Sequence, residues 1–218
     1  QLGVKYDEAK LKAVMDRSWE LRELELEILE LRKAAPAPMT AADGFAVMFP
    51  RMYLSGTEKA VDFHRRMRDE LKAKVEKGLG VLQNERFRLL WSGIPFWFNM
   101  GLINLFEDFG GVVVIDVTYT NFFRSERRYA EYPLKELAYR CTIGGLGITS
   151  LVDTNLFAAK EYKVDGAVLS FSSTCRPLYI DQLEVRNQLK EVYDLPSLLL
   201  ESDMADERRY DAALVQAN

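Results

Sequence analysis

The sequence predicts an α/β protein in which a helical N-terminal segment precedes a small flavodoxin-like α/β/α sheet of four parallel strands. The first 80 residues carry only helical apolar periodicity. From residue 85 onward, short apolar runs alternate with helical patterns, as in βαβ units. Several of these runs are apolar throughout, which is typical of strands covered on both faces. We therefore expect two domains, a helical segment at 1–80 and an α/β domain at 81–218.

Three helices are predicted in the helical segment. Residues 6–33 contain no proline or glycine, and their apolar residues recur three and four positions apart. Pro36 and Pro38 end this helix because proline has no N–H to donate. Helices at 41–52 and 58–77 follow, separated by a Ser-Gly-Thr break.

Four strands and their connecting helices are predicted in the α/β domain. The strands are expected at 87–91, 112–117, 166–171 and 196–201. Helices are expected at 99–109, 133–142, 151–162 and 180–193, with a last one starting near 206–209. Connections of this length favour a parallel sheet with right-handed crossovers. Residues 118–131, rich in aromatic and charged side chains, are expected to form a long loop.

The composition excludes several classes of protein. The chain of 218 residues is 48% hydrophobic and 28% charged with a net charge of -4, so it has no basic surface for nucleic acid. It contains no apolar run long enough to span a membrane and no signal peptide. Two cysteines make a secreted disulfide framework improbable, and we expect a cytoplasmic protein. Since the chain begins at Gln1, it is expected to be a fragment.

Cys175 is the strongest candidate for chemistry. It lies in a Ser-Ser-Thr-Cys-Arg-Pro turn between the third predicted strand and a helical pattern. Ligands of open α/β sheets bind at this carboxyl edge. Arg176 and the backbone amides of the following helix would favour the thiolate, which is the form that binds iron or attacks a substrate.

Other candidate groups give weaker signals. His64, the only histidine, stands beside two arginines in a charged helical stretch and is expected at the surface. The glycine cluster at 144–147 lacks the spacing of a nucleotide-binding loop. The acidic residues at 201–207 are expected to be solvated, with a capping role at the next helix. Cys141 is expected to be a small buried side chain within a helix.

Several segments, in order, are similar to one known family. The chain resembles the 2-hydroxyacyl-CoA dehydratase and benzoyl-CoA reductase family, and in particular its subunits like the D-component of 2-hydroxyglutaryl-CoA dehydratase. The matching segments are Phe171 to Pro177, Leu195 to Arg208, Glu85 to Pro95, Tyr132 to Leu134 and Glu161 to Val168.

The resemblance implies a subunit of an enzyme that pairs with a homologous second subunit and holds a 4Fe-4S cluster. An ATP-dependent activator protein would inject one low-potential electron. The reaction would be either radical dehydration of an (R)-2-hydroxyacyl-CoA, a lyase reaction, or reduction of the benzoyl-CoA ring, an oxidoreductase reaction. Both belong to anaerobic metabolism.

The resemblance also implies roles for particular residues. Cys175 matches the last of three cysteines that bind the cluster in such a subunit, and the other two lie in an N-terminal domain that this chain is expected to lack. One thiolate cannot hold a cluster alone, so we expect the isolated chain to contain no iron and to be inactive. Ser173, Thr174 and Arg176 are predicted to donate hydrogen bonds around the cluster.

A substrate pocket is predicted after the first strand. Trp91, Ile94, Pro95 and Phe96 would line it and contact the acyl group. Packing in the protein core is the alternative, which the usual placement of aromatic residues beside a strand favours.

A non-catalytic function is the alternative hypothesis. The chain would then be an α/β scaffold or assembly domain with a buried, inert Cys175, and the charged stretch at 23–27 would be a docking face. Alkylation discriminates between the two hypotheses, because an iron-binding thiolate reacts readily near neutral pH. A thiol-dependent transferase would need a nearby base, which the only histidine does not provide.

Overall fold

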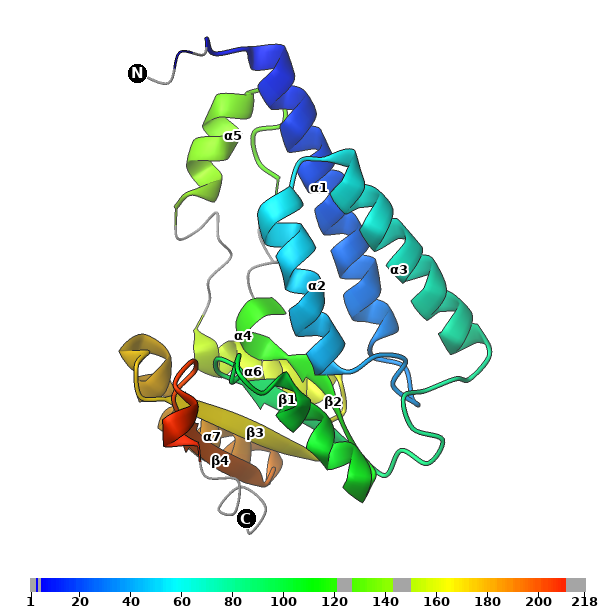
Figure 1. Cartoon of the computed structure of the whole chain (residues 1–218), viewed down its shortest axis with the longest axis vertical. Coiled ribbons are helices and arrows are strands. Elements are labelled where there is room, and N and C mark those ends of the chain that lie inside the picture. The colour runs from blue at the N-terminus through cyan, green and yellow to red at the C-terminus, as the bar shows by residue number, and fades with distance from the viewer. Residues whose placement is uncertain (1–2, 4, 121–126, 143–149, 211–218) are drawn as a thin grey trace.

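The computed structural model describes residues 3, 5–120, 127–142 and 150–210. Three long helices stand on one side of a layered α/β unit, and the sheet lies at the base of this helical part (Figure 1). The architecture agrees with the prediction of an N-terminal helical region followed by a parallel sheet. None of the described helices combines the length and the apolar character that crossing a membrane requires.

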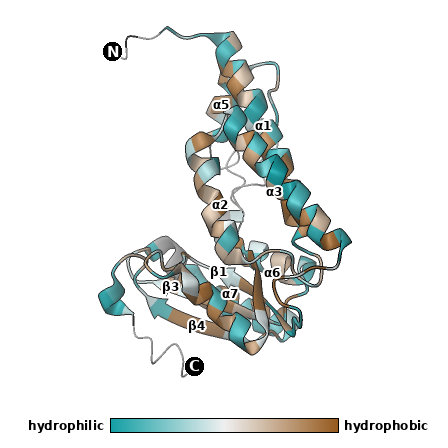
Figure 2. Cartoon of the chain, turned by 45° about the vertical axis from the view of Figure 1, so that its right-hand side comes forward, coloured by the Kyte–Doolittle hydropathy of each residue, from teal (hydrophilic) through white to brown (hydrophobic). Residues whose placement is uncertain are grey.

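The three predicted helices are present, with ends that differ from the prediction by at most two residues. They are α1 (Glu8–Leu31), α2 (Ala41–Leu54) and α3 (Glu58–Glu76). Asp7, Thr40 and Thr57 cap their N-termini, and each side chain accepts a hydrogen bond from the backbone N–H three residues later. Figure 2 shows that the outward side of α3 is mainly hydrophilic, as expected for an amphipathic surface helix.

The four predicted strands form one sheet in which all neighbours are parallel. The strands are β1 (Phe87–Ser92), β2 (Gly111–Asp116), β3 (Gly166–Ser172) and β4 (Ser197–Ser202). Their order in the sheet is β2-β1-β3-β4. Every residue of β2 and β3 is buried. Continuous burial explains why these strands read as uninterrupted apolar runs.

Helices cover both faces of the sheet, which creates two apolar cores. On one face, residues of α6 (Leu151–Glu161) and α7 (Arg176–Tyr193) pack against alternate strand residues such as Leu90 and Leu169. On the other face, α2 and the 3₁₀ helix η1 (Met100–Phe109) pack against Trp91 and its neighbours. The two sets of strand residues alternate, as strand geometry requires.

Several of the remaining elements differ from the prediction. The segment predicted as a helix at 99–109 is a 3₁₀ helix. The predicted loop at 118–131 begins inside a short helix, α4 (Val117–Thr120). The helix expected at 133–142 is α5 (Pro133–Arg140), and the last predicted helix is a single 3₁₀ turn, η3 (Glu207–Arg209). The glycine cluster at 144–147 lies outside the described residues.

Arg88 of β1 connects the helical segment to the sheet. Its side chain is buried and donates hydrogen bonds to the carbonyl oxygens of Lys33, Ala34 and Tyr162 at 3.3, 3.0 and 2.9 Å. Glu85 lies 2.6 Å from the same guanidinium. The division into domains at residue 80 stays a prediction, although these contacts cross it.

Candidate functional site at the carboxyl edge of the sheet

Each of the four strands ends on a polar residue. The last residues of β2, β1, β3 and β4 are Asp116, Ser92, Ser172 and Ser202, in the order of the sheet. All four are buried, and Ser172 is the register partner of Ser202. A row of buried polar groups therefore runs along the edge where ligands of parallel sheets bind.

Cys175 lies directly above this row, at the N-terminus of α7. Its backbone N–H donates to the carbonyl oxygen of Ser172 at 3.1 Å, which closes a tight turn after β3. Cys175 is the N-cap residue of a helix of 18 residues, but its side chain makes no capping hydrogen bond. It is partly exposed.

The neighbouring residues tie the Cys175 turn to the loop that follows β4. Ser173 donates its backbone N–H to Ser202 O at 3.2 Å, and its hydroxyl accepts a hydrogen bond from Arg209 at 3.3 Å. The hydroxyl groups of Ser172 and Thr174 lie 3.2 Å apart. Thr174 and Arg176 are exposed. These contacts order the residues on either side of Cys175, and the roles of Ser173, Thr174 and Arg176 around a cluster stay predictions.

Asp203 holds the loop after β4 in place. It is buried, and its carboxylate accepts hydrogen bonds from the backbone N–H groups of Ala205 and Asp206 at 2.9 Å each. These two bonds, and a weaker one from Thr174, lower the pKa of Asp203. The expectation of a solvated residue is therefore wrong for Asp203. The capping role is confirmed for Asp206, whose side chain accepts from Arg208 N at the start of η3.

The four residues predicted to contact an acyl group lie beneath the edge. Trp91 and Phe96 are almost completely buried and meet edge to face, with ring centroids 6.0 Å apart. Ile94 and Pro95 are also buried, and the carbonyl oxygen of Ile94 accepts a hydrogen bond from Ser170 at 2.6 Å. These side chains pack in the core, the alternative that the sequence left open. Contact with an acyl group stays a prediction.

Sequence reasoning missed a buried network at the end of β1. Gln182 of α7 is fully buried and donates to the Ser92 hydroxyl at 3.3 Å. The backbone N–H of Gly93 donates to the Thr118 hydroxyl at 2.7 Å. Gly93 has φ of +105°, which few other residues adopt. A glycine directly after a predicted strand was the available signal.

Three expectations about titratable side chains are wrong. His64 is fully buried, and its Nδ1 lies 2.8 Å from the carbonyl oxygen of Ala60. Glu25, in the stretch expected to be a charged docking face, is buried beside it and pairs with Arg51 at 3.1 Å. Burial raises the pKa of Glu25 to about 7 and lowers that of His64. Cys141 is exposed at the C-terminus of α5, although a buried position was expected.

Comparison with known proteins identifies the family. A sequence profile described as 2-hydroxyglutaryl-CoA dehydratase, D-component, matches residues 1–216. The chain belongs to this family. Among curated relatives, one of the benzoyl-CoA reductase subunits of Thauera aromatica is 26% identical over 98% of the chain and 53% of its own length.

Two further curated relatives are similar at the same level. The (R)-phenyllactyl-CoA dehydratase alpha subunit of Clostridium sporogenes is 25% identical over 97% of the chain and 52% of its own length. The alpha subunit of (R)-2-hydroxyglutaryl-CoA dehydratase from Acidaminococcus fermentans is 24% identical over 97% and 44%. The chain therefore spans about half the length of these relatives.

A complete iron-sulfur cluster does not fit the residues of this family member alone. Such clusters are held mainly by about four thiolates, or three with another ligand. The sequence has two cysteines, one in the turn above β3 and the other at the end of α5. Within the described ranges, no group of three or more His, Cys, Asp and Glu side chains could hold a metal ion.

Proposed function

We propose that this chain is part of a subunit of an enzyme that acts on an acyl-CoA thioester. The reaction is either the loss of water from an (R)-2-hydroxyacyl-CoA or the reduction of an aromatic acyl-CoA ring. The observation that carries the proposal is the match to one family over residues 1–216, since its curated relatives bear the names of both kinds of enzyme.

We propose further that Cys175 contributes one thiolate to an iron-sulfur cluster, of the 4Fe-4S type, whose other ligands lie outside these 218 residues. The partial exposure of Cys175 and its place at the N-terminus of α7 support this role. Ser173, Thr174 and Arg176 would then donate hydrogen bonds to the cluster and thereby raise its reduction potential. The edge of a parallel sheet suits a shared site because loops from another domain can reach it.

The proposed enzyme needs two protein partners. One is a homologous second subunit, since the relatives are themselves named as subunits of larger enzymes. The other is an ATP-dependent activator that supplies a low-potential electron. Trp91, Ile94, Pro95 and Phe96 would form the floor below the acyl group, because they lie at or just after the carboxyl end of β1 and are buried there.

Anaerobic alkylation of the assembled enzyme tests the role of Cys175. When iron is present, we expect Cys175 to be protected from iodoacetamide, and after chelation of the iron we expect it to react. Cys141 is exposed and serves as the internal control, because it should react equally in both states. Mass spectrometry of tryptic peptides measures the alkylation of Cys175 and of Cys141. Labelling of Cys175 at the same rate with and without iron would contradict the proposal.

Iron content provides a second measurement. Replacing Cys175 by serine should remove most of the iron from the assembled enzyme, whereas Cys141→Ser should retain it, because only the first thiol is proposed as a ligand. The isolated chain, treated anaerobically with iron and sulfide, should not retain a stoichiometric cluster. A stable cluster on the isolated chain would show that the ligands are not shared.

A further inference from the structure

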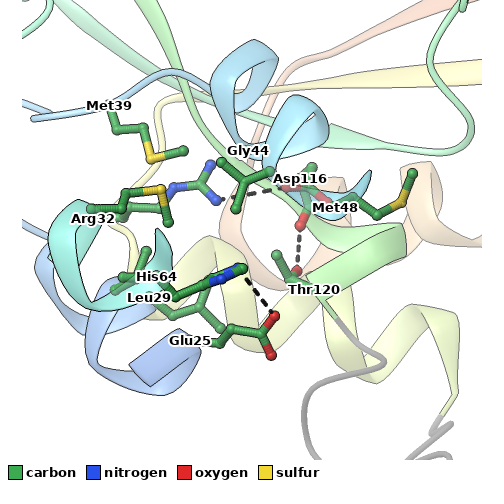
Figure 3. A pocket seen from close by; sticks show the side chains of 12 residues that line it. Glu25, Leu29, Arg32, Met39, Gly44, Met48, His64, Asp116 and Thr120 are labelled. Atoms are coloured by element: carbon green, nitrogen blue, oxygen red, sulfur yellow. Dashed lines mark hydrogen bonds and ion pairs between the residues drawn. The ribbon is translucent and has the colours of Figure 1, made fainter. Parts of the chain in front are cut away.

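A small cavity lies where the helical segment meets the carboxyl end of β2. It has a volume of about 40 Å³ and is lined by residues of α1, α2 and α3 together with Arg32, Met39, Asp116 and Thr120. Figure 3 shows Arg32 opposite Asp116 on one side of the cavity and His64 beside Glu25 on another. The sheet order separates this site from the Cys175 turn, because β1 lies between β2 and β3.

Arg32 offers unused hydrogen-bond donors to this cavity. The residue is 3% exposed, and its Nε and Nη2 have no hydrogen-bond partner among the described residues. Its Nη1 lies 3.7 Å from Asp116, which is an ion pair but too long for a hydrogen bond. Buried donors without partners are costly, so a group that accepts from them would bind favourably. The Nε–Nη2 edge of a guanidinium is a planar fork that matches a carboxylate.

Because Gly44 of α2 has no side chain, space is left beside the guanidinium of Arg32. A Cβ atom at position 44 would lie 3.0 Å from Arg32 Nη1 and 3.4 Å from Nη2. The cavity volume corresponds to roughly three water-sized groups at about 10–15 Å³ each, which is room for the carboxylate group, and the cavity is partly open, so an attached chain would extend through its open side. Its other walls include Met39, Met48 and Met67, whose flexible apolar side chains adapt to short aliphatic groups.

The charges around the cavity permit an anion. Arg32 and Arg51 oppose Asp116 and Glu25. Burial raises the pKa of Glu25 to about 7 in spite of the nearby Arg51, Arg22 and Arg140. Below pH 7 the carboxyl of Glu25 is therefore mostly neutral, and the two arginines outnumber the one remaining carboxylate. Burial lowers the pKa of His64, and its Nδ1 is hydrogen-bonded to the carbonyl oxygen of Ala60.

We propose that this cavity binds the carboxylate of a short aliphatic acid through the Nε–Nη2 edge of Arg32. The aliphatic chain would lie against the methionine side chains of α2 and α3. The same chemistry is offered by a free acid and by an acyl-CoA that carries a terminal carboxylate.

Calorimetric titration of the full chain with butyrate, below pH 7 and at constant ionic strength, tests this proposal. We expect saturable binding to the wild type. In Arg32→Lys the affinity should fall about tenfold or more, because an ammonium lacks the planar fork. Gly44→Ala should also weaken binding, since its methyl group narrows the space beside the guanidinium. Arg66→Met, which removes an exposed arginine of α3, is the control and should bind as the wild type does.

Succinyl-CoA and butyryl-CoA distinguish the two sources of the carboxylate. Binding of succinyl-CoA that depends on Arg32, with none for butyryl-CoA, would assign the site to an acyl group. Arg32-dependent binding of butyrate alone would assign it to a free acid. If Arg32→Lys does not fold, Gly44→Ala alone decides, because it retains every charge. Absence of saturable binding, equal binding by the variants, or equal competition by chloride would overturn the proposal and leave the cavity to water.

Discussion

Gly93 determines how the chain leaves β1 at the carboxyl edge. Its φ of +105° turns the backbone so that its N–H reaches the Thr118 hydroxyl at 2.7 Å. The turn also brings the chain close to β3, and a Cβ at position 93 would lie 2.3 Å from the carbonyl oxygen of Ser170. Only a residue without a side chain satisfies both requirements.

Replacing Gly93 by alanine should destabilise the protein by about 2–4 kcal/mol, because it adds backbone strain and a steric clash in a packed region. Urea unfolding measures the difference. Gly78→Ala is a matched control, since Gly78 also has a positive φ of +64° but a Cβ there would meet no atom within 4 Å. This control should cost about 1 kcal/mol. Equal losses for the two variants would show that the contact with Ser170 is unimportant.

The position of Cys175 could be predicted from the sequence, but that of His64 could not. An apolar run that ends in a turn before a helix has one common solution in α/β proteins, so the thiol had to lie at the carboxyl edge. His64 stands next to exposed arginines, which suggested the surface. Its burial follows from helical periodicity, because Ala60, Val61 and Leu71 lie on the same face of α3. In a helix, residues three and four positions apart share a face, so the exposure of adjacent residues does not indicate whether a side chain is buried.

Elements with continuous apolar runs were predicted best. The strands were found to within one residue because their burial on both faces leaves a strong signal. The type of η1 was not predictable, because the same apolar residues suit a 3₁₀ helix or an α-helix. In α1 the apolar stripe was visible, but Glu25 lies inside it, between Leu24 and Ile28, where it pairs with Arg51 of α2. Such long-range partners leave no local pattern.

The packing of α1, α2 and α3 around Glu25 should make stability depend on pH. The folded-state pKa of about 7 lies above the ordinary value of 4.5 for a free carboxyl. Between these values the folded state binds a proton more tightly, so this group lowers the free energy of unfolding as pH rises towards 7. The effect should be roughly 1–3 kcal/mol. His64 acts in the opposite direction, because its lowered pKa favours folding as pH rises.

Glu25→Gln isolates the contribution of this carboxyl. Compared with the wild type, the variant should gain stability steadily as pH rises from the range of a free carboxyl to pH 7, when urea unfolding is measured across that range. Glu27→Gln, on the exposed side of α1, should follow the wild-type profile. A Glu25→Gln profile parallel to that of the wild type would mean that Glu25 stays ionised in the folded protein.

Contacts at both the amino and the carboxyl ends of the strands connect the helical segment to the sheet. Arg88 joins β1 to the end of α1 and to the end of α6. At the carboxyl edge, Arg32 and Asp116 form a buried ion pair that joins α1 to β2. The cavity beside this ion pair is lined both by the helical segment and by Asp116 of β2, so the two parts must keep a fixed relation for this site to form.

Arg88→Met should separate the unfolding of the helical segment from that of the sheet. The change leaves Glu85 buried without its partner and three carbonyl oxygens without donors, which should cost about 3–5 kcal/mol. Trp19 in α1 and Trp91 in β1 report on the two parts when each is the only tryptophan. In the wild-type background both signals should change at the same urea concentration, whereas in Arg88→Met the Trp19 signal should change first.

Arg86→Met, which removes an exposed arginine nearby, should leave the two transitions together. Coincident transitions in Arg88→Met would instead show that apolar packing between α2 and the sheet is sufficient to couple the two parts.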